Sequence, residues 1–152
     1  FLSYMVAISK MKEIHRVFEY HGAEHKTIAC YEAELELTVE NVRKQIRFHP
    51  RCGTSFIFLV VLLSIIIGMF LPWKNLWARF GLQLLMLIPE TSIGYELIKL
   101  AGRYDNIFTR IISAPGIWLQ HITTCEPDDP QIEVAIAALK PCIPENKEDD
   151  KW

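Results

Sequence analysis

The pattern of hydrophobic and polar residues divides the chain into an apolar middle and two polar flanks. Residues 55–72, SFIFLVVLLSIIIGMFLP, contain no charged side chain. About 17 helical residues at about 1.5 Å each extend about 26 Å, close to the thickness of the hydrocarbon core of a bilayer. A chain of 152 residues offers little core that could bury such a helix in a soluble domain instead. The pattern therefore predicts a membrane-spanning helix, with Pro72, Trp73 and Lys74 as its stop and interfacial anchor.

A second hydrophobic segment covers residues 76–99 and has two interpretations. Residues 80–89 are uncharged, but Glu90 follows Pro89 directly and Glu96 comes later. The segment is either a kinked helix that crosses the membrane back, which we favour, or a helix that leaves the membrane at Pro89. A carboxylate inside a membrane helix is costly and is by default a functional candidate. Glu90 and Glu96 therefore also support a transport hypothesis, the weakest of the three that we consider.

The polar flanks show helical rather than strand-like patterns. Residues 11–35 have loosely periodic apolar positions, with Gly22 as a weak point, and Thr38 is a suitable N-cap for a short helix that reaches Arg47. Residues 107–122 are apolar but contain Pro115–Gly116 at their middle, which predicts a broken interfacial or re-entrant element, or alternatively an amphipathic core helix. Asp129 is placed to cap a last helix with Pro130 at its first position, running to Lys140.

These patterns predict an all-α integral membrane protein with two transmembrane helices and cytoplasmic helical flanks. The apolar residues Phe1–Ile8 have the character of the end of an upstream membrane helix, so the chain is interpreted as part of a longer protein. The predicted organisation comprises N-terminal helices with the HGAEH and HPRC motifs in residues 1–54, two spans in 55–99, an interfacial or cytoplasmic segment in 100–143, and a charged, disordered tail in 144–152.

Charge bears on both partners and sidedness. The net charge of −2 and the absence of a basic-aromatic stripe exclude nucleic acid as an expected partner. Basic residues are dense before the first span and sparse in the connector. The positive-inside rule then predicts a multi-pass protein of the cell membrane whose motifs face the cytoplasm. The residues concerned are Lys10, Lys12, Arg16, Lys26, Arg43, Lys44, Arg47 and Arg51 before the first span, Lys74 and Arg79 in the connector, and Lys99, Arg103 and Arg110 after the second.

The stretch His21-Gly22-Ala23-Glu24-His25 carries the clearest candidate chemistry. On a helix, His21, Glu24 and His25 share one surface, in the H-x-x-E-H order of inverzincin metalloproteases. Such a group predicts a divalent metal, zinc in the first instance, with His21 and His25 as ligands and Glu24 as general base.

His49-Pro50-Arg51-Cys52 offers further ligands at a predicted turn near the membrane surface. Four protein ligands, His21, His25, His49 and Cys52, would form a closed structural site, whereas three and a water molecule would form a catalytic one. Alternatively, the two helical histidines lie on a surface or form hydrogen bonds with the acidic turn. Further candidate polar residues of the site are Glu126, Asp128, Asp129 and Glu96.

The cysteines, Cys30, Cys52, Cys125 and Cys142, form no CxxC pair, so no zinc ribbon is predicted. On a cytoplasmic face they are expected to stay reduced. Small buried residues are their expected role, with Cys52 as a candidate ligand.

Several motifs, taken together, resemble the YqhQ-like family of bacterial membrane proteins. They are HGAEHKTI, LTVENVRK, HPRCGTSF and PGIWLQHITTCEPDD followed by EVAIAAL, and they extend from about Tyr20 to Leu139. The family is a domain of unknown function, and its label as a predicted metal-dependent enzyme implies a membrane protein with a metal site. Members are longer at the N-terminus.

Two main functional hypotheses result. The first is a metal-dependent membrane enzyme, hydrolytic in its reaction, with a His/Glu/Cys cluster at the cytoplasmic membrane surface. The second is a non-enzymatic assembly or accessory factor of a membrane complex, in which the same cluster is structural and the basic face around residues 43–51 binds a protein partner. In both, the lipid bilayer is the expected surrounding.

Overall fold

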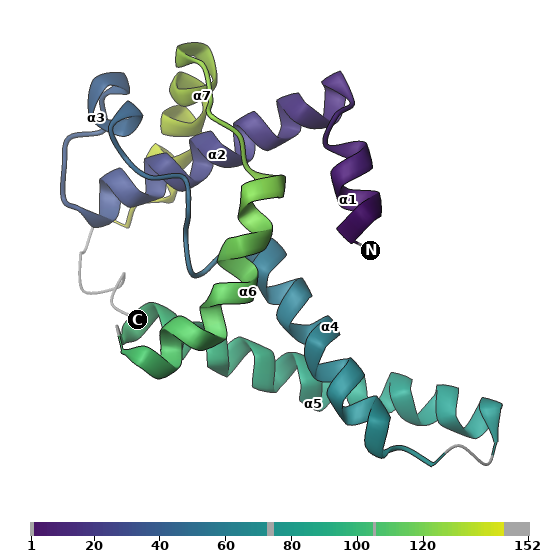
Figure 1. Ribbon diagram of the computed structural model, residues 1–152. Helices are drawn as coiled ribbons and strands as arrows, with labels where there is room; N and C mark the ends of the chain where they lie inside the picture. The colour runs from purple at the N-terminus through teal and green to yellow at the C-terminus, as the bar shows by residue number, and fades with distance from the viewer. Residues whose placement is uncertain (1, 73–74, 105, 145–152) are drawn as a thin grey trace. The chain divides into compact units, whose positions relative to one another are not determined.

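The computed structural model describes residues 2–72, 75–104 and 106–144, and within these ranges every element is helical (Figure 1). The prediction of an all-α chain is therefore confirmed for the described part. Phe1, the interfacial pair Trp73–Lys74 and the predicted disordered tail after Pro144 lie outside the described residues. The elements are α1 (Leu2–Ile8), α2 (Lys12–Glu32), α3 (Val39–Arg43), α4 (Gly53–Phe70), α5 (Leu76–Arg103), α6 (Ile107–Thr123), α7 (Asp129–Leu139) and the 3₁₀ turn η1 (Lys140–Cys142).

The helices form two compact units. The first comprises residues 1–49 and 119–152, and the second comprises residues 50–118. Helix α6 contributes residues 107–118 to the second unit and residues 119–123 to the first. The two polar flanks thus belong to one unit, and the apolar middle forms the other.

The first unit has a small aliphatic core between α2, α3 and α7. Its buried members are Ala23 and Cys30 of α2, Val42 of α3, and Ile132 and Ile136 of α7. Apolar side chains at these positions leave water when the three helices pack, which is the dominant favourable contribution to such a core. Cys30 is a small buried residue, as the sequence predicts.

Gly22 has a packing role in this unit. A Cβ atom at this position would lie 2.0 Å from the carbonyl oxygen of Cys125, whose N–H donates a hydrogen bond to Phe18 O at 2.9 Å. The chain after α6 therefore crosses α2 so closely that only glycine fits. The weak point in the predicted helix is the place where the two flanks of the sequence meet.

Three predicted helix ends differ from the structure. Helix α3 is capped by Thr38 as predicted but ends at Arg43, not Arg47. Helix α7 is capped by Asp128 rather than Asp129, and Pro130 takes the second helical position; the Asp128 side chain accepts from Gln131 N in a capping box. Helix α7 also ends at Leu139, followed by η1.

The second unit is built on the antiparallel pair α4 and α5, which run alongside each other in Figure 1. Helix α4 has a mean hydropathy of 2.5 and, among the described residues, is the helix long and apolar enough to cross a membrane. Helix α5 continues unbroken through Pro89 to Arg103. Its N-terminal cap, Asn75, accepts hydrogen bonds from the N–H groups of Trp77 and Ala78.

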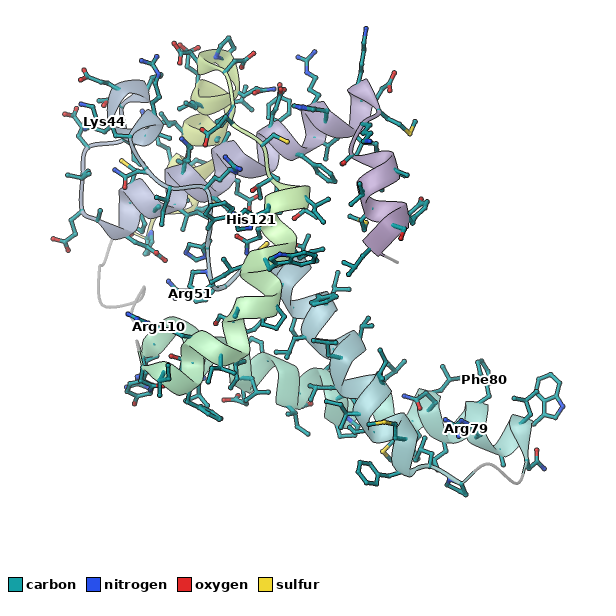
Figure 2. All side chains as sticks on the ribbon, in the orientation of Figure 1. Lys44, Arg51, Arg79, Phe80, Arg110 and His121 are labelled. Carbon is teal, nitrogen blue, oxygen red and sulfur yellow. The ribbon has the colours of Figure 1, made fainter. Side chains whose placement is uncertain are left out.

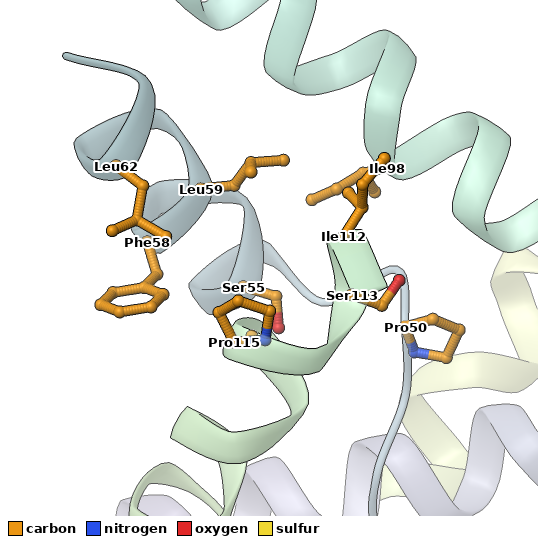
Figure 3. A pocket seen from close by; sticks show the side chains of 10 residues that line it. Pro50, Ser55, Phe58, Leu59, Leu62, Ile98, Ile112, Ser113 and Pro115 are labelled. Carbon is orange, nitrogen blue, oxygen red and sulfur yellow. The ribbon is translucent and has the colours of Figure 1, made fainter. Parts of the chain in front are cut away.

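Helix α6 is continuous, so the predicted break at Pro115–Gly116 was wrong. A Cβ at Gly116 would lie 2.5 Å from Cβ of Ser55, so the small residue allows α6 to approach α4 closely. Next to this contact is a small pocket that α4, α5 and α6 enclose (Figure 3). Its lining includes Ser55, Leu59, Leu62, Ile98, Ile112 and Ser113.

Candidate metal centre

Helix α2 places His21 and His25 on one face of the first unit. Their spacing of four residues brings the two side chains next to each other, and their ring centroids lie 4.4 Å apart at an interplanar angle of 67°. His25 is buried and His21 half-buried. The predicted pairing of these two imidazoles is therefore realised in the geometry of the helix.

His49 joins them from the extended segment after α3. Its ring centroid lies 5.9 Å from that of His25. The position of His49 is fixed through its backbone, because the amide of Gln120 accepts from His49 N at 2.8 Å and donates to His49 O at 2.7 Å. Gln120 is fully buried. Three histidines from two segments of the chain thus meet in one cluster within the first unit.

Two of the three rings are oriented by backbone carbonyl groups. Nδ1 of His21 lies 2.8 Å from Thr123 O, and Nδ1 of His25 lies 2.6 Å from Arg47 O. A carbonyl oxygen only accepts, so in both rings Nδ1 carries the proton and donates it. In a neutral ring Nε2 then keeps its lone pair.

His49 is oriented by a carboxylate. Its Nε2 lies 3.1 Å from Oε2 and 3.3 Å from Oε1 of Glu32, and the side chain of Glu32 is partly exposed. The carboxylate accepts from Nε2–H, which leaves the lone pair of the neutral ring on Nδ1.

The three rings have hydrogen bonds of the kind that orient metal-ligating histidines. In metal sites, a ligating imidazole typically donates its other N–H to a carbonyl or carboxylate, which fixes the tautomer and the ring direction. The carbonyl and carboxylate contacts of His21, His25 and His49 match this pattern.

Glu24 and Cys52, the other two predicted residues of the centre, lie in different units. Glu24 is exposed on α2, between the buried residues Ala23 and His25, and its role as general base stays a prediction. Cys52 belongs to the second unit, where it is buried as the N-cap residue of α4 with Sγ 3.0 Å from Oγ1 of Thr54. Its role as a ligand also stays a prediction.

The acidic turn after α6 lies in a network of basic side chains. Glu126 accepts from Lys26 Nζ at 2.7 Å and from Arg47 Nη1 at 2.8 Å. Partial burial raises the pKa of Glu126, but the hydrogen bonds and positive charges of Lys26 and Arg47 outweigh this effect and hold the pKa below its usual value. Lys26 itself is nearly buried and also donates to Arg43 O at 3.1 Å.

The other predicted polar residues serve local structure in the described part. Asp128 caps α7, and Asp129 accepts a bidentate hydrogen bond from the guanidinium group of Arg43. The Nδ1 atoms of His21 and His25 bond to backbone carbonyls of Thr123 and Arg47, and the alternative of hydrogen bonds from these histidines to Glu126 and Asp128 stays a prediction. Glu96 is exposed on α5, in the second unit.

Glu32 and Gln120 are the residues that sequence reasoning missed. Glu32 follows His21 by eleven residues, or about three helical turns, so a search along the same face of α2 would have found it. Gln120 carries no such signal, because it is 71 residues from the segment it holds. Next to Gln120, the ring of His121, labelled in Figure 2, stacks on the ring of Phe48 with centroids 4.4 Å apart. This contact holds the segment before His49 at a second point.

Comparisons with known proteins agree with the sequence motifs. A model of the family described as "Protein of unknown function (DUF1385)" matches residues 1–145. The chain is 43% identical over 139 residues to the "Uncharacterized protein YqhQ" of Bacillus subtilis (strain 168). That alignment covers 91% of this chain and 44% of the relative, so the chain spans less than half of the relative's length. No solved structure matches. Because the family model matches nearly the whole chain, the chain belongs to the DUF1385 family, and YqhQ is a relative of it.

Proposed function

We propose that this protein is a metal-dependent membrane enzyme whose first unit holds a divalent ion, zinc in the first instance, on His21, His25 and His49. The observation that carries the proposal is the orientation of the three rings, since each has one nitrogen on a carbonyl or carboxylate oxygen. In metal sites, imidazoles held in this way bind the ion through their other nitrogen, and the proposal assigns that role to these three residues.

Hydrolysis is the reaction class that this donor set supports best. A divalent ion at the cluster would supply a Lewis acid and an activated water molecule. Three histidines leave a coordination position open, as in catalytic rather than structural zinc sites. Glu24, exposed one residue before His25, would accept a proton from the attacking water as general base.

The structural alternative has its own support. Gln120 holds both backbone groups of His49, and the close contact between Gly22 and Cys125 fastens the same region of α2. In this alternative the histidine cluster ties together segments from both ends of the sequence, and the protein is an accessory or assembly factor in a membrane complex.

Membrane residence is supported by the polarity of the second unit. Its buried residues are all small or polar, namely Cys52, Ser55, Gly68, Glu90, Gly94, Thr109 and Gly116. Its exposed residues include most of the large apolar side chains of α4 and α5, such as Ile65, Phe70 and Phe80, and Phe80 points away from α5 in Figure 2. A surface of this kind is unfavourable in water but suits acyl chains, and small residues are typical of helix contacts in membranes.

Helix α6 repeats this inverted polarity. On its packed side Thr109 and Gly116 are buried and Ser113 and Ile112 are half-buried. Ile107, Phe108, Ile111 and Trp118 are exposed. On α5, the hydroxyls of Thr91 and Ser92 donate to carbonyl oxygens of their own helix, so they present no unsatisfied group to lipid. These features support the proposed second crossing by α5, and the basic residues before α4 support a cytoplasmic location of the first unit.

The metal site is tested by elemental analysis of protein purified from membranes without chelator. We expect about one zinc ion per chain, and an affinity at least about tenfold lower in His21→Ala, His25→Ala and His49→Ala. His15→Ala is the matched control, because His15 lies on the same helix, is half exposed and pairs with Glu19. Metal well below one equivalent in the wild type after supplementation with zinc would contradict the proposal.

Cobalt substitution separates the catalytic from the structural version. With three protein ligands, the visible spectrum of the cobalt form should change when azide enters the open position, and Glu24→Gln should keep both metal and spectrum. A closed set of four protein ligands would leave the spectrum unchanged by azide and would favour the accessory role.

A further inference from the structure

Helices α4 and α5 of the second unit meet along two matched stripes. Every fourth residue of α4, from Phe56 through Val60 and Ser64 to Gly68, faces α5. At one end, a Cβ at Gly94 of α5 would lie 3.1 Å from Val60 Cγ2 and 3.3 Å from Phe56 Cε2. This end of the contact is apolar and tightly packed.

The other end of the same contact is polar. The carboxyl group of Glu90 lies against the hydroxyl of Ser64, and Gln83 Nε2 donates to Glu90 Oε1 at 3.3 Å. One turn further, Arg79 Nη2 donates to Gly68 O at 2.9 Å and Nη1 to Leu71 O at 3.4 Å. Arg79, Gln83 and Glu90 lie on one face of α5 because they are spaced by four and seven residues. We refer to Ser64, Gly68, Arg79, Gln83 and Glu90 as the polar seam.

Glu90 is the unusual member of the polar seam. Its carboxyl side chain is fully buried in the middle of an apolar helix pair, where ionisable residues are rare. Its hydrogen-bond partners in the described structure are the neutral groups of Ser64 and Gln83. The guanidinium group of Arg79 donates to the carbonyl oxygens of Gly68 and Leu71. An ionised carboxylate removed from water without an opposite charge is strongly unfavourable. A neutral carboxylic acid avoids that cost and adds an O–H donor to the seam.

We propose that Glu90 is a proton-binding site inside the α4–α5 pair. Its carboxylate takes up a proton from water, an O–H bond forms on the carboxyl group, and the group changes from one negative charge to none. Ser64 and Gln83 position the neutral acid, and the apolar contact of Gly94 with Val60 and Phe56 closes the seam on one side. The proposal does not rest on the metal site, because all of its residues belong to the second unit.

The charged groups near this site are few among the described residues of the facing helices. Helix α4 contains no ionisable side chain, and α5 contributes Arg79, Glu90, Glu96, Lys99 and Arg103. Glu96, Lys99 and Arg103 follow Glu90 by six or more residues, on the far side of the Gly94 contact. Arg79 is therefore the cationic member of the polar seam.

Labelling with dicyclohexylcarbodiimide tests the proposal on the whole chain in phosphatidylcholine–phosphatidylglycerol vesicles. This apolar reagent reacts with a protonated carboxyl group: the proton passes to a carbodiimide nitrogen, the carboxyl oxygen bonds to the central carbon, and the adduct rearranges to a stable N-acylurea. Mass spectrometry should locate the adduct on Glu90, with a yield that falls as the pH rises. Glu90→Gln should abolish it, whereas Glu96→Gln, an exposed carboxylate on the same helix, should leave it unchanged.

Infrared spectroscopy gives a second measurement that does not depend on access of the reagent. The wild type should show the C=O stretch of a protonated carboxylic acid, and this band should be missing in Glu90→Gln, whose amide keeps a hydrogen-bond acceptor and the volume of the side chain. A carboxylate band for Glu90 at neutral pH, with no protonated band, would overturn the proposal whatever the labelling shows.

Discussion

The ion pairs of Glu126 are the residue-scale feature with the clearest energetic consequence. Lys26 is nearly buried on α2, and its ammonium group lies 2.7 Å from Glu126 Oε2 and 3.1 Å from Arg43 O. The carboxylate side is more exposed, which screens the interaction. A charge as enclosed as that of Lys26 nevertheless loses its principal counter-ion when Glu126 is neutralised.

We expect Glu126→Gln to destabilise the first unit by about 1–2 kcal/mol at neutral pH, more than for a fully exposed pair. The folded-state pKa of Glu126 lies below its usual value of 4.5, so this stability is present above that value and is lost as the pH falls through the folded pKa. The gap in melting temperature between wild type and variant should therefore close in acid. Glu40→Gln, in an exposed pair with Lys44, should give no measurable gap; a gap independent of pH would contradict the assignment.

At the scale of elements, the start of α7 depends on one of two neighbouring aspartates. Asp128 has extended backbone dihedral angles and accepts from Gln131 N at 2.9 Å, and the side chain of Gln131 returns to Asp128 N at 2.9 Å. This reciprocal capping box satisfies two backbone N–H groups that the first turn would leave unpaired. Gln131 also donates to Glu19 on α2, so the cap orients α7 on its neighbour.

Replacing Asp128 by alanine should cost about 1 kcal/mol of folding stability, the usual value of an N-cap. Asp128→Asn should recover most of this loss, because asparagine caps about as well as aspartate. Chemical denaturation of the three proteins in the same detergent measures the differences. No measurable loss in Asp128→Ala, or no recovery in Asp128→Asn, would contradict the assignment of the cap to Asp128.

The comparison of these elements with the sequence shows which signals were local. Helix type, the Thr38 cap and the apolar α4 are properties of neighbouring residues, and the sequence predicts them. The end of α3 is not local: Lys26 takes the carbonyl of Arg43, and His25 takes that of Arg47, so side chains of α2 satisfy groups that a longer helix would have satisfied itself. Either Asp128 or Asp129 could serve as the N-cap by residue type, and the sequence pattern does not determine at which of the two the helix begins.

The candidate site shows the same division. The pairing of His21 with His25 results from helical spacing alone, and the motif predicts it. The backbone of His49 is held beside α2 by Gln120, and Gly22 lets the backbone of Cys125 pass close to α2. Both contacts join residues about 70 to 100 positions apart in the sequence. No periodicity within a flank encodes such distant contacts, so the sequence places the candidate ligands but not the groups that orient them.

The whole molecule combines two units of opposite polarity. The first has a small aliphatic core and also buries polar residues such as Lys26 and Gln120. The fully buried residues of the second are small or polar, and many of its large apolar side chains are exposed. If the second unit resides in a membrane, as proposed, acyl chains would cover its exposed apolar side chains. Three helices, α4, α5 and α6, share the inverted pattern, although α4 alone meets a length and hydropathy criterion among the described residues.

This argument predicts that α6 contacts lipid. In vesicles with brominated acyl chains, a variant that keeps Trp118 as its single tryptophan should lose fluorescence strongly, because Trp118 lies on the exposed apolar face of α6 with Ile107 and Ile111. A single tryptophan at Tyr20→Trp, exposed on α2 of the first unit, should be quenched by aqueous iodide instead. Quenching of Trp118 by iodide, with no effect of bromine, would mean that a protein surface or water covers α6, and the membrane unit would then consist of α4 and α5 without it.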